Sequence, residues 1–294
     1  MAEPVLIVRL LGGLGNQLFQ YATGRAAAQQ LGVPLRLDAR YLARKGHHSG
    51  LALEAFNITA EQASPAQLAR FPQWKIQLTR GLRKLVRPLG GIYHEHGTGF
   101  DPRALQRRPG QMLSGFWQSE RYFQPVADTL RTELTLCQPL PDVAEPLLHA
   151  MHQPGSVALH VRRGDYVRNA AALARHGVCS AAYYRAGVAH IAAAVAQPTF
   201  FVFSDDPAWA QQALGLPANS VYVSGPRFRP EHDLVMISAC QHQIIANSTF
   251  SWWGAWLNPN PRKIVIAPTP WYDDPALGSH DLIPESWTQL DKQG

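Results

Sequence analysis

The sequence has few of the residues that would build a disulfide framework, a zinc site or a membrane span. Its 294 residues contain three cysteines, Cys137, Cys179 and Cys240, which are far apart and form no CxxC pair. This argues against a disulfide framework and a zinc site, and it favours a reducing compartment. The apolar run at residues 4–11 is interrupted by Arg9, so it is too short for a membrane span or a signal peptide's apolar region. We therefore expect a soluble, cytoplasmic protein.

Charged residues are also sparse, at 16%, and the net charge of +6 is not gathered into long basic blocks. A nucleic-acid-binding protein would need a concentrated basic face, so we expect no nucleic-acid partner and favour a small anionic ligand. The hydrophobic content of 46% is typical of a globular chain, and the length favours two domains. Eight tryptophans are many, and sugar and nucleobase sites commonly use aromatic faces.

Short apolar runs alternate with helical patterns in both halves, which predicts an α/β fold. In the first half, strands are expected at 5–11 and 35–38, on either side of a helix at 18–31. In the second half, strands are expected at 157–161, 199–203, 221–223, 241–246 and 264–267, and the chain after Trp271 is expected to be an irregular tail. The best linker candidate is Gln-Pro-Leu-Pro at 138–141, so the predicted domains are 1–140 and 141–294.

The strongest candidate site lies at the end of the expected strand 157–161. Because strand side chains alternate, His160 and Arg162 share one face, and the strand ends at Arg163-Gly164-Asp165. Ligands bind at the carboxyl ends of strands in open α/β sheets, and adjacent arginines suit a phosphate or a carboxylate. A surface ion pair between Arg162 or Arg163 and Asp165 explains the same charges equally well.

A glycine-rich turn at residues 12–17 joins the first expected strand to the first helix. Its spacing is not GxGxxG, so it fits a dinucleotide fingerprint poorly. Gly13 and Gly15 would allow an anion to approach the backbone closely, with Asn16 and Gln17 beside it. A tight turn without a ligand is the simpler explanation of these residues.

Two further polar segments follow strands of the second half. Asp206 and Pro207 fit the N-cap and first position of a helix, whereas Asp205 is free to accept hydrogen bonds from guanine or from a ribose. Residues 247–251, Asn-Ser-Thr-Phe-Ser, offer hydroxyl and N–H groups at a helix start, which binds phosphate without a metal ion. The tryptophans at 252, 253 and 256 have helical spacing and are expected in the core.

The segment 41–91 is predicted to be helical and variable. Within it, one helical face carries Trp74, Leu78, Leu82 and Leu85, with Lys75, Arg83, Lys84 and Arg87 around them. This amphipathic basic helix would suit an anionic membrane that carries a lipid-linked acceptor. An ordinary surface helix is the more common explanation, since amphipathic helices are frequent.

Taken together, four stretches resemble the α-1,2-fucosyltransferase family (glycosyltransferase family 11), including its bacterial members. They are GGLGNQLFQYATGRA at 12–26, HVRRGDY at 160–166, FSDD at 203–206 and NSTFSWWGAWL at 247–257. The stretches GFDP at 99–102 and GFWQSERYF at 115–123 also look like that family. The combination is specific although each motif alone is not, and it covers the chain to about Trp271.

The resemblance implies an inverting glycosyltransferase of the GT-B type, with two Rossmann-like domains facing across a cleft. Its donor would be GDP-β-L-fucose and its acceptor the 2-hydroxyl of a terminal β-galactoside, with no metal ion or other cofactor required. Residues 1–140 would form the acceptor side, and residues 141–294 would hold the donor. The product would be an α-1,2-fucosylated O-antigen or other surface oligosaccharide. Lipid linkage of the acceptor and peripheral contact with the inner membrane remain open.

The resemblance also implies roles for individual residues. His160 and Arg162 would contact the nucleotide, with Arg162 on the β-phosphate, and Asp205 or Asp206 would bind guanine. The donor set also includes Gly13, Gly15, Asn16, Gln17, Arg163, Asn247, Ser248, Thr249, Phe250 and Ser251. Asn16 would position groups near the transferred sugar. Asp165 would be either the general base or, as we favour, the group that orients Arg162, because an adjacent arginine lowers the pKa of a carboxyl group.

Three rival interpretations remain. A fucose- or galactose-binding lectin would use the tryptophans, but it would not need two arginines at a strand end. A nucleic-acid-binding protein would need a basic face that this charge distribution does not supply. A transferase forming another linkage, such as α-1,6, would have much the same donor site.

Overall fold

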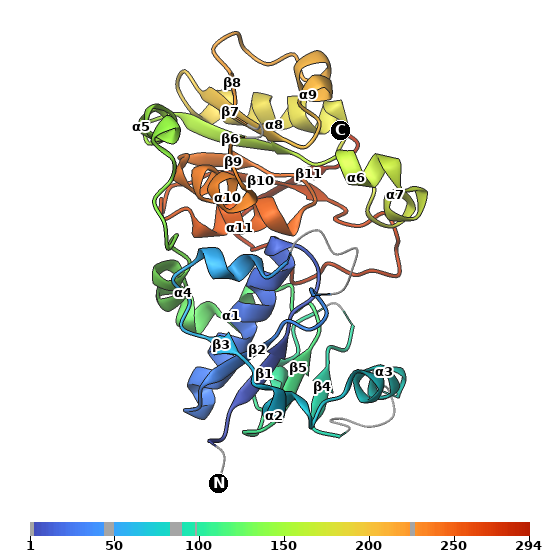
Figure 1. Ribbon diagram of the computed structural model, residues 1–294. Helices are drawn as coiled ribbons and strands as arrows, with labels where there is room; N and C mark the ends of the chain where they lie inside the picture. The colour runs from blue at the N-terminus through green and yellow to red at the C-terminus, as the bar shows by residue number, and fades with distance from the viewer. Residues whose placement is uncertain (1–2, 44–49, 83–89, 98, 224–226) are drawn as a thin grey trace. The chain divides into compact units, whose positions relative to one another are not determined.

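The chain forms two compact units, each built around one parallel β-sheet (Figure 1). The computed structural model describes residues 3–43, 50–82, 90–97, 99–223 and 227–294. The first unit is residues 1–137 with 280–282, and the second is 138–279 with 283–294. The division lies beside the Gln-Pro-Leu-Pro segment. The assignment of an acceptor side and a donor side to the two domains stays a prediction.

The first unit has a five-stranded sheet in the order β3-β2-β1-β5-β4. Its strands are β1 (Leu6–Arg9), β2 (Leu35–Asp38), β3 (Glu61–Gln62), β4 (Ile92–His94) and β5 (Met112–Ser114), all paired in parallel. Its helices are α1 (Leu14–Leu31), α2 (Pro65–Leu68), α3 (Gln73–Gly81) and α4 (Ala127–Glu133). Helix α1 begins four residues earlier than expected. It ends at Gly32, whose φ of +65° is the left-handed conformation that glycine adopts readily.

The helical prediction for 41–91 is wrong for much of the described segment. This part of the chain contains a 3-10 turn (Ala52–Ala55), the strand β3 and two short helices, α2 and α3. Pro65 begins α2 and Pro72 precedes α3, and proline is well placed there but cannot sit inside a continuous helix. Of the amphipathic face, Leu85 and its basic neighbours Arg83, Lys84 and Arg87 lie outside the described residues.

Residues 280–282 join the first unit through one carboxylate. Oδ2 of Asp281 accepts the N–H of Phe100 at 2.7 Å, and Oδ1 lies 2.8 Å from Nη1 of Arg121. Such long-range pairing is not encoded in any local pattern, and the sequence did not predict it.

The second unit has a six-stranded sheet in the order β11-β10-β9-β6-β7-β8. Its strands are β6 (Ser156–Val161), β7 (Thr199–Ser204), β8 (Val221–Tyr222), β9 (His242–Ile244), β10 (Val265–Thr269) and β11 (Thr288–Asp291), all parallel to their neighbours. Its helices are α5 (Glu145–Met151), α6 (Gly164–Arg168), α7 (Ala170–His176), α8 (Ala181–Ala194), α9 (Pro207–Ala213), α10 (Pro230–Ala239) and α11 (Thr249–Leu257).

Helices cover both faces of this second sheet, as Figure 1 shows for α8 and α9 on one side and α10 and α11 on the other. Val157, Leu159 and Val161 of β6 pack in the core layer that contains side chains of α8 and α9. Ala158 packs in the opposite layer with side chains of α5 and α10. The alternation predicted for this strand is confirmed, and it directs His160 to the side that holds α10 and α11.

The prediction of an irregular tail after Trp271 is wrong, because residues 288–291 form the strand β11. This strand pairs in parallel with β10, from Ile266 opposite Thr288 to Thr269 opposite Asp291. Its residues Thr-Gln-Leu-Asp are half-buried or exposed, as befits an edge strand, so they carry no apolar run that a sequence pattern would detect.

The predicted aromatic core is confirmed. Trp252 and Trp253 are fully buried and Trp256 nearly so. Cys137, Cys179 and Cys240 are free. Within the described ranges, the chain has no helix with the length and apolar character needed to cross a bilayer.

Candidate functional site

Three of the predicted polar segments lie at the carboxyl ends of neighbouring strands in the second sheet. From β6 the chain adds β7 and β8 on one side of the sheet and then β9, β10 and β11 on the other. The order therefore reverses between β6 and β9, and in open α/β sheets ligands bind at the carboxyl ends of strands at such a switch point. Residues 162–165 follow β6, residues 205–206 follow β7, and residues 247–251 follow β9.

The carboxylate of Asp205 binds the loop that carries Arg162 and Arg163. Its Oδ2 lies 3.3 Å from Nε of Arg162, and its Oδ1 accepts the backbone N–H of Arg163 at 2.8 Å. The side chains of Arg162 and Asp205 are 36% and 25% exposed, so both remain accessible to a ligand. Asp205 thus orients the Arg162 guanidinium, the role that the sequence analysis gave to Asp165. The backbone of Asp165 lies in α6, and its side chain is outside the described part of the chain.

Arg163 contacts the loop and the helix that follow β7. Its Cζ lies 4.1 Å from the ring centre of Trp209, a cation–π contact, and its Nε is 3.7 Å from Oδ2 of Asp206. Asp206 also caps α9 by accepting the N–H of Trp209 at 3.2 Å, and Pro207 is the first residue of that helix. The predicted cap is confirmed. The contact with Trp209 was missed, because nothing in the sequence pairs these two positions.

His160 is buried at the same edge and is held in its neutral form. Its ring centre lies 5.5 Å from that of Phe250, the second residue of α11. Burial, assisted by the positive charge of Arg162, lowers the pKa of His160 from 6.5 to about 3. Its Nδ1 has no hydrogen-bond partner among the described residues. A neutral imidazole with an unpaired buried nitrogen suits a ligand hydrogen bond and excludes a cationic role at neutral pH.

The segment after β9 places hydroxyl and N–H groups at the start of α11. Ser248 is the N-cap, and its Oγ accepts the N–H of Phe250 at 3.3 Å. Thr249 is partly exposed at the first helical position. Ser251 is buried and donates its hydroxyl proton to the carbonyls of Ala246 and Ser248, at 3.5 and 3.3 Å. The hydroxyl of Thr249 and the N–H groups of the first turn are therefore the better placed anion donors.

Asn247 anchors this segment to the rest of the second unit. Its side-chain Nδ2 donates to the carbonyls of His176, Gly177 and Trp271 at 2.8, 3.3 and 3.2 Å. Its Oδ1 accepts the thiol of Cys179, with a sulfur–oxygen distance of 3.6 Å. The buried amide is thus fully engaged within the protein, and any contribution of its side chain to ligand binding is one of positioning.

Replacing Asn247 by alanine is expected to lower the free energy of unfolding by about 2–3 kcal/mol, because the buried carbonyls of Gly177 and Trp271 and the partly buried carbonyl of His176 lose a donor. Asn57→Ala is a matched control. The side-chain amide of Asn57 likewise donates hydrogen bonds, to Oγ1 of Thr135 and the carbonyl of Leu136, but it is exposed. Water replaces its bonds, so the loss there should stay below about 1 kcal/mol. Chemical denaturation measures both variants, and equal losses would contradict the anchoring role.

In the first unit, the predicted glycine turn follows the carboxyl end of β1. Gly13 is the N-cap of α1, and its carbonyl accepts the N–H groups of Asn16 and Gln17. Gln17 is fully buried and binds the carbonyls of Gly12 and Gly50 and the N–H of Ala52, so its side chain ties loops together. Oδ1 of Asn16 accepts Nε2 of Gln118 at 2.9 Å. Gly15 lies buried inside the first turn of α1. The ligand roles of these residues stay predictions.

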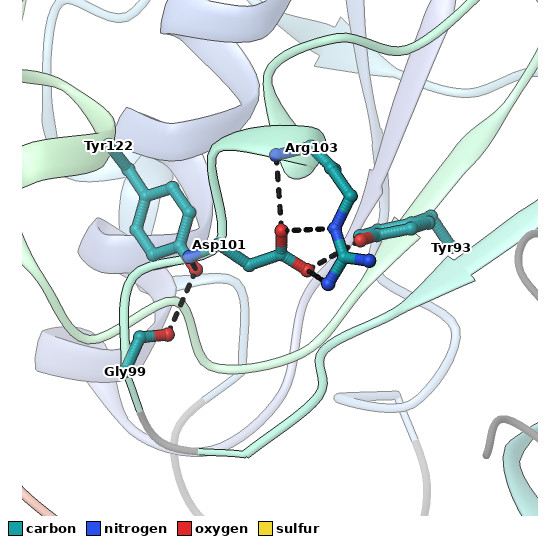
Figure 2. Close-up of polar contacts among 5 residues, drawn as sticks. All are labelled: Tyr93, Gly99, Asp101, Arg103 and Tyr122. Atoms are coloured by element: carbon teal, nitrogen blue, oxygen red, sulfur yellow. Dashed lines mark hydrogen bonds and ion pairs between the residues drawn. The ribbon is translucent and has the colours of Figure 1, made fainter.

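Asp101 of the GFDP stretch is a structural hub (Figure 2). Its carboxylate accepts the hydroxyl of Tyr93 at 2.6 Å and pairs with the guanidinium of Arg103 at 2.8 Å, while its N–H donates to Tyr122 at 2.8 Å. Burial raises the pKa of Asp101, but the hydrogen bonds from Arg103 and Tyr93 outweigh burial and hold it below its usual range. This stretch supports the fold of the first unit and needs no ligand to explain it.

The sequence profile of glycosyl transferase family 11 matches residues 99–291, about two thirds of the chain. The chain belongs to this family. It is 34% identical to an alpha-1,2-colitosyltransferase of Escherichia coli over 98% of this chain and 99% of that protein. It is 26% identical to the galactoside 2-alpha-L-fucosyltransferase Sec1 of Mus musculus, over 87% of this chain and 65% of that protein.

The fold is also that of solved fucosyltransferase structures. The superposition on the crystal structure of POFUT1 in complex with GDP-fucose spans 90% of this chain and 98% of the POFUT1 chain, with a TM-score of 0.55 and 14% sequence identity. This likeness shows the fold alone. The predicted α/β class of the GT-B type is confirmed, as is the family resemblance, and the protein is a glycosyltransferase.

Proposed function

We propose that this glycosyltransferase transfers L-fucose from GDP-β-L-fucose, with inversion, to the 2-hydroxyl of a terminal β-galactoside. The observation that carries the proposal is the meeting of Arg162, His160 and the start of α11 at the switch point of the second sheet. A guanidinium, a neutral imidazole and helix N–H groups at one sheet edge suit a nucleoside diphosphate. The α-1,2 linkage and the galactoside acceptor are supported by the names of the relatives.

The reaction must stabilise negative charge that grows on the β-phosphate as GDP leaves. The acceptor oxygen attacks the anomeric carbon from the opposite face, the bond to GDP breaks, and the acceptor proton passes to a base or to solvent. In this proposal the charge is met by Arg162, the Thr249 hydroxyl and the N–H groups of α11, and no metal ion is required. Asp205 contributes by holding the guanidinium at 3.3 Å. Asp205 and Asp206 remain the candidates for guanine, and Asp165 remains a candidate base.

Colitose is the second candidate for the transferred sugar, favoured by the similarity to the colitosyltransferase. Colitose is L-fucose without its 3-hydroxyl group, so the two GDP-linked donors differ by one polar group. A site that hydrogen-bonds that hydroxyl rejects the deoxy sugar by about 10⁴-fold, whereas an apolar pocket discriminates only about 10²-fold. The ratio of kcat/KM for the two donors therefore shows which sugar the pocket is built to bind.

The decisive experiment incubates the purified chain with lactose, EDTA and either GDP-fucose or GDP-linked colitose, followed by linkage analysis. We expect a product fucosylated at the 2-hydroxyl of galactose and a kcat/KM that favours GDP-fucose. A preference for the colitose donor would replace the proposed sugar. Donor hydrolysis without transfer would contradict the galactoside acceptor, and a 6-linked product would contradict the linkage. Loss of activity in EDTA that is restored by added metal would contradict metal independence.

A further inference from the structure

Helix α3 exposes its large apolar side chains and buries a smaller face. Ile76 and Thr79 are buried, with Ile76 in the core layer that contains Val5 and Ile92. Thr79 shares a hydrogen bond of 2.8 Å with Nε2 of His94 in β4. On the outer side, Trp74, Leu78 and Leu82 are 66%, 55% and 38% exposed. An ordinary surface helix turns its large apolar residues inward, so this outer face lacks the packing that such residues usually have.

The three exposed residues form a continuous stripe. Trp74 and Leu78 stand four positions apart within α3, which places one above the other, and Leu82 follows four positions later as the C-cap of the helix. Trp74 is the most exposed of the large apolar residues in the described chain. We call Trp74, Leu78 and Leu82 the α3 stripe. An indole with flanking leucines is the side-chain set that inserts at the boundary between lipid headgroups and acyl chains.

The chain segment that carries the stripe contains basic residues and no acidic ones. Residues 62–82 contain no aspartate or glutamate, and their basic residues are Arg70, Lys75 and Arg80. Arg70 and Arg80 are exposed at opposite ends of α3. The ammonium group of Lys75 donates a hydrogen bond to the carbonyl of Arg70 at 3.1 Å, which places its charge near the N-terminal end of α3.

A basic pocket continues this surface beside Arg70. The guanidinium of Arg70 lies close to Gly110, because a Cβ atom built on that glycine would be 3.1 Å from Nη1 of Arg70. The neighbouring pocket, of about 380 Å³, is lined by Gln106, Arg107, Arg108 and Gln111. Guanidinium groups at a pocket of this size suit a phosphate-bearing headgroup better than an apolar protein surface.

We propose that the α3 stripe with Arg70 and Arg80 is a docking surface for an anionic lipid bilayer. The apolar stripe would enter the interfacial layer, and the arginines at both ends would face anionic headgroups. This inference is independent of the donor sugar and of the proposed function. It concerns the attachment of the protein to a membrane, in which the lipid bilayer would cover the exposed α3 stripe.

Sedimentation of the full chain with vesicles tests the proposal. We expect binding to phosphatidylcholine vesicles that contain 30% phosphatidylglycerol, and at least about 25-fold weaker binding to phosphatidylcholine alone, since neutral lipid removes the attraction for both arginines. Trp74→Gln/Leu78→Gln should reduce binding at least tenfold, and Arg70→Gln/Arg80→Gln should reduce it by roughly fivefold per charge removed. Val143→Gln is the matched control, since Val143 is an apolar residue of the second unit that is 49% exposed. This variant should bind vesicles as the unmodified chain does. Transfer to a soluble acceptor should be unchanged in all these variants.

A depth measurement separates lipid insertion from loose adsorption. Acyl chains brominated near the headgroup should quench the fluorescence of the exposed Trp74 when the protein binds, and Leu78→Gln, which keeps the indole, should weaken this quenching. The proposal is overturned if the unmodified chain does not bind anionic vesicles, or if Trp74→Gln/Leu78→Gln binds them as well. It is also overturned if sedimentation velocity shows a concentration-dependent dimer that this double variant abolishes, because a second copy would then be the occupant.

Discussion

Arg162→Ala is expected to lower the turnover number of the transfer reaction by about 10²- to 10³-fold. Arg162 stands at the carboxyl end of β6, beside the start of α11, where charge would grow on the leaving diphosphate. Fixed donors at such a position act mainly on the transition state, so kcat should fall more than KM rises. The pair with Asp205 is partly exposed, at 36% and 25%, so its loss should cost less than about 1 kcal/mol of stability.

Two further variants test whether geometry or charge carries this effect. Arg162→Lys keeps the charge but loses the planar fork that Asp205 orients, so an intermediate loss of roughly tenfold is expected. Arg185→Ala is the control, because Arg185 is an exposed arginine of α8 that donates to the carbonyl of Ala213 at 3.1 Å. Its turnover should match that of the unmodified enzyme. Retention of most transfer activity in Arg162→Ala, with a normal denaturation curve, would remove Arg162 from the proposed mechanism.

The features that the sequence predicted are those encoded locally. The period-two pattern of residues 157–161 fixed which face His160 would share with Arg162, and the structure has that alternation in β6. The pair Asp206-Pro207 predicted a helix start because an N-cap acceptor and a fixed φ act within one turn. Ser248 is likewise a cap that its neighbours explain.

The features that the sequence missed depend on residues far apart in the chain. Asp205 lies 43 positions after Arg162, and only the parallel pairing of β6 with β7 brings them to the same edge. The stacking of Arg163 on Trp209 and the anchoring of Asn247 to the carbonyl of Trp271 have the same origin. A residue pattern within one strand or turn cannot predict such a contact, because strand order is set by the packing of the whole sheet.

The second large effect concerns acid stability. His160 has a pKa of about 3 in the folded protein, lowered by burial and by the charge of Arg162, against an ordinary value of 6.5 in the unfolded chain. Above pH 6.5 the imidazole is neutral in both states. Between pH 6.5 and about 3 the unfolded chain binds a proton that the folded protein does not, so the free energy of unfolding falls as the pH falls. The shift corresponds to roughly 4–5 kcal/mol over this window, at about 1.4 kcal/mol for each pKa unit.

His160→Gln isolates this contribution, because glutamine is polar but does not titrate. Urea denaturation of both proteins from pH 8 to pH 4 should give curves that run parallel above pH 6.5 and converge below it, as only the unmodified protein loses the histidine term. Other groups titrate in both proteins and cancel in the difference. Curves that stay parallel down to pH 4 would mean that the folded protein accommodates a protonated His160, and the neutral imidazole proposed for the donor site would then be wrong. The burial that keeps the ring neutral thus links acid stability to ligand binding, since the same ring has an Nδ1 with no hydrogen-bond partner among the described residues.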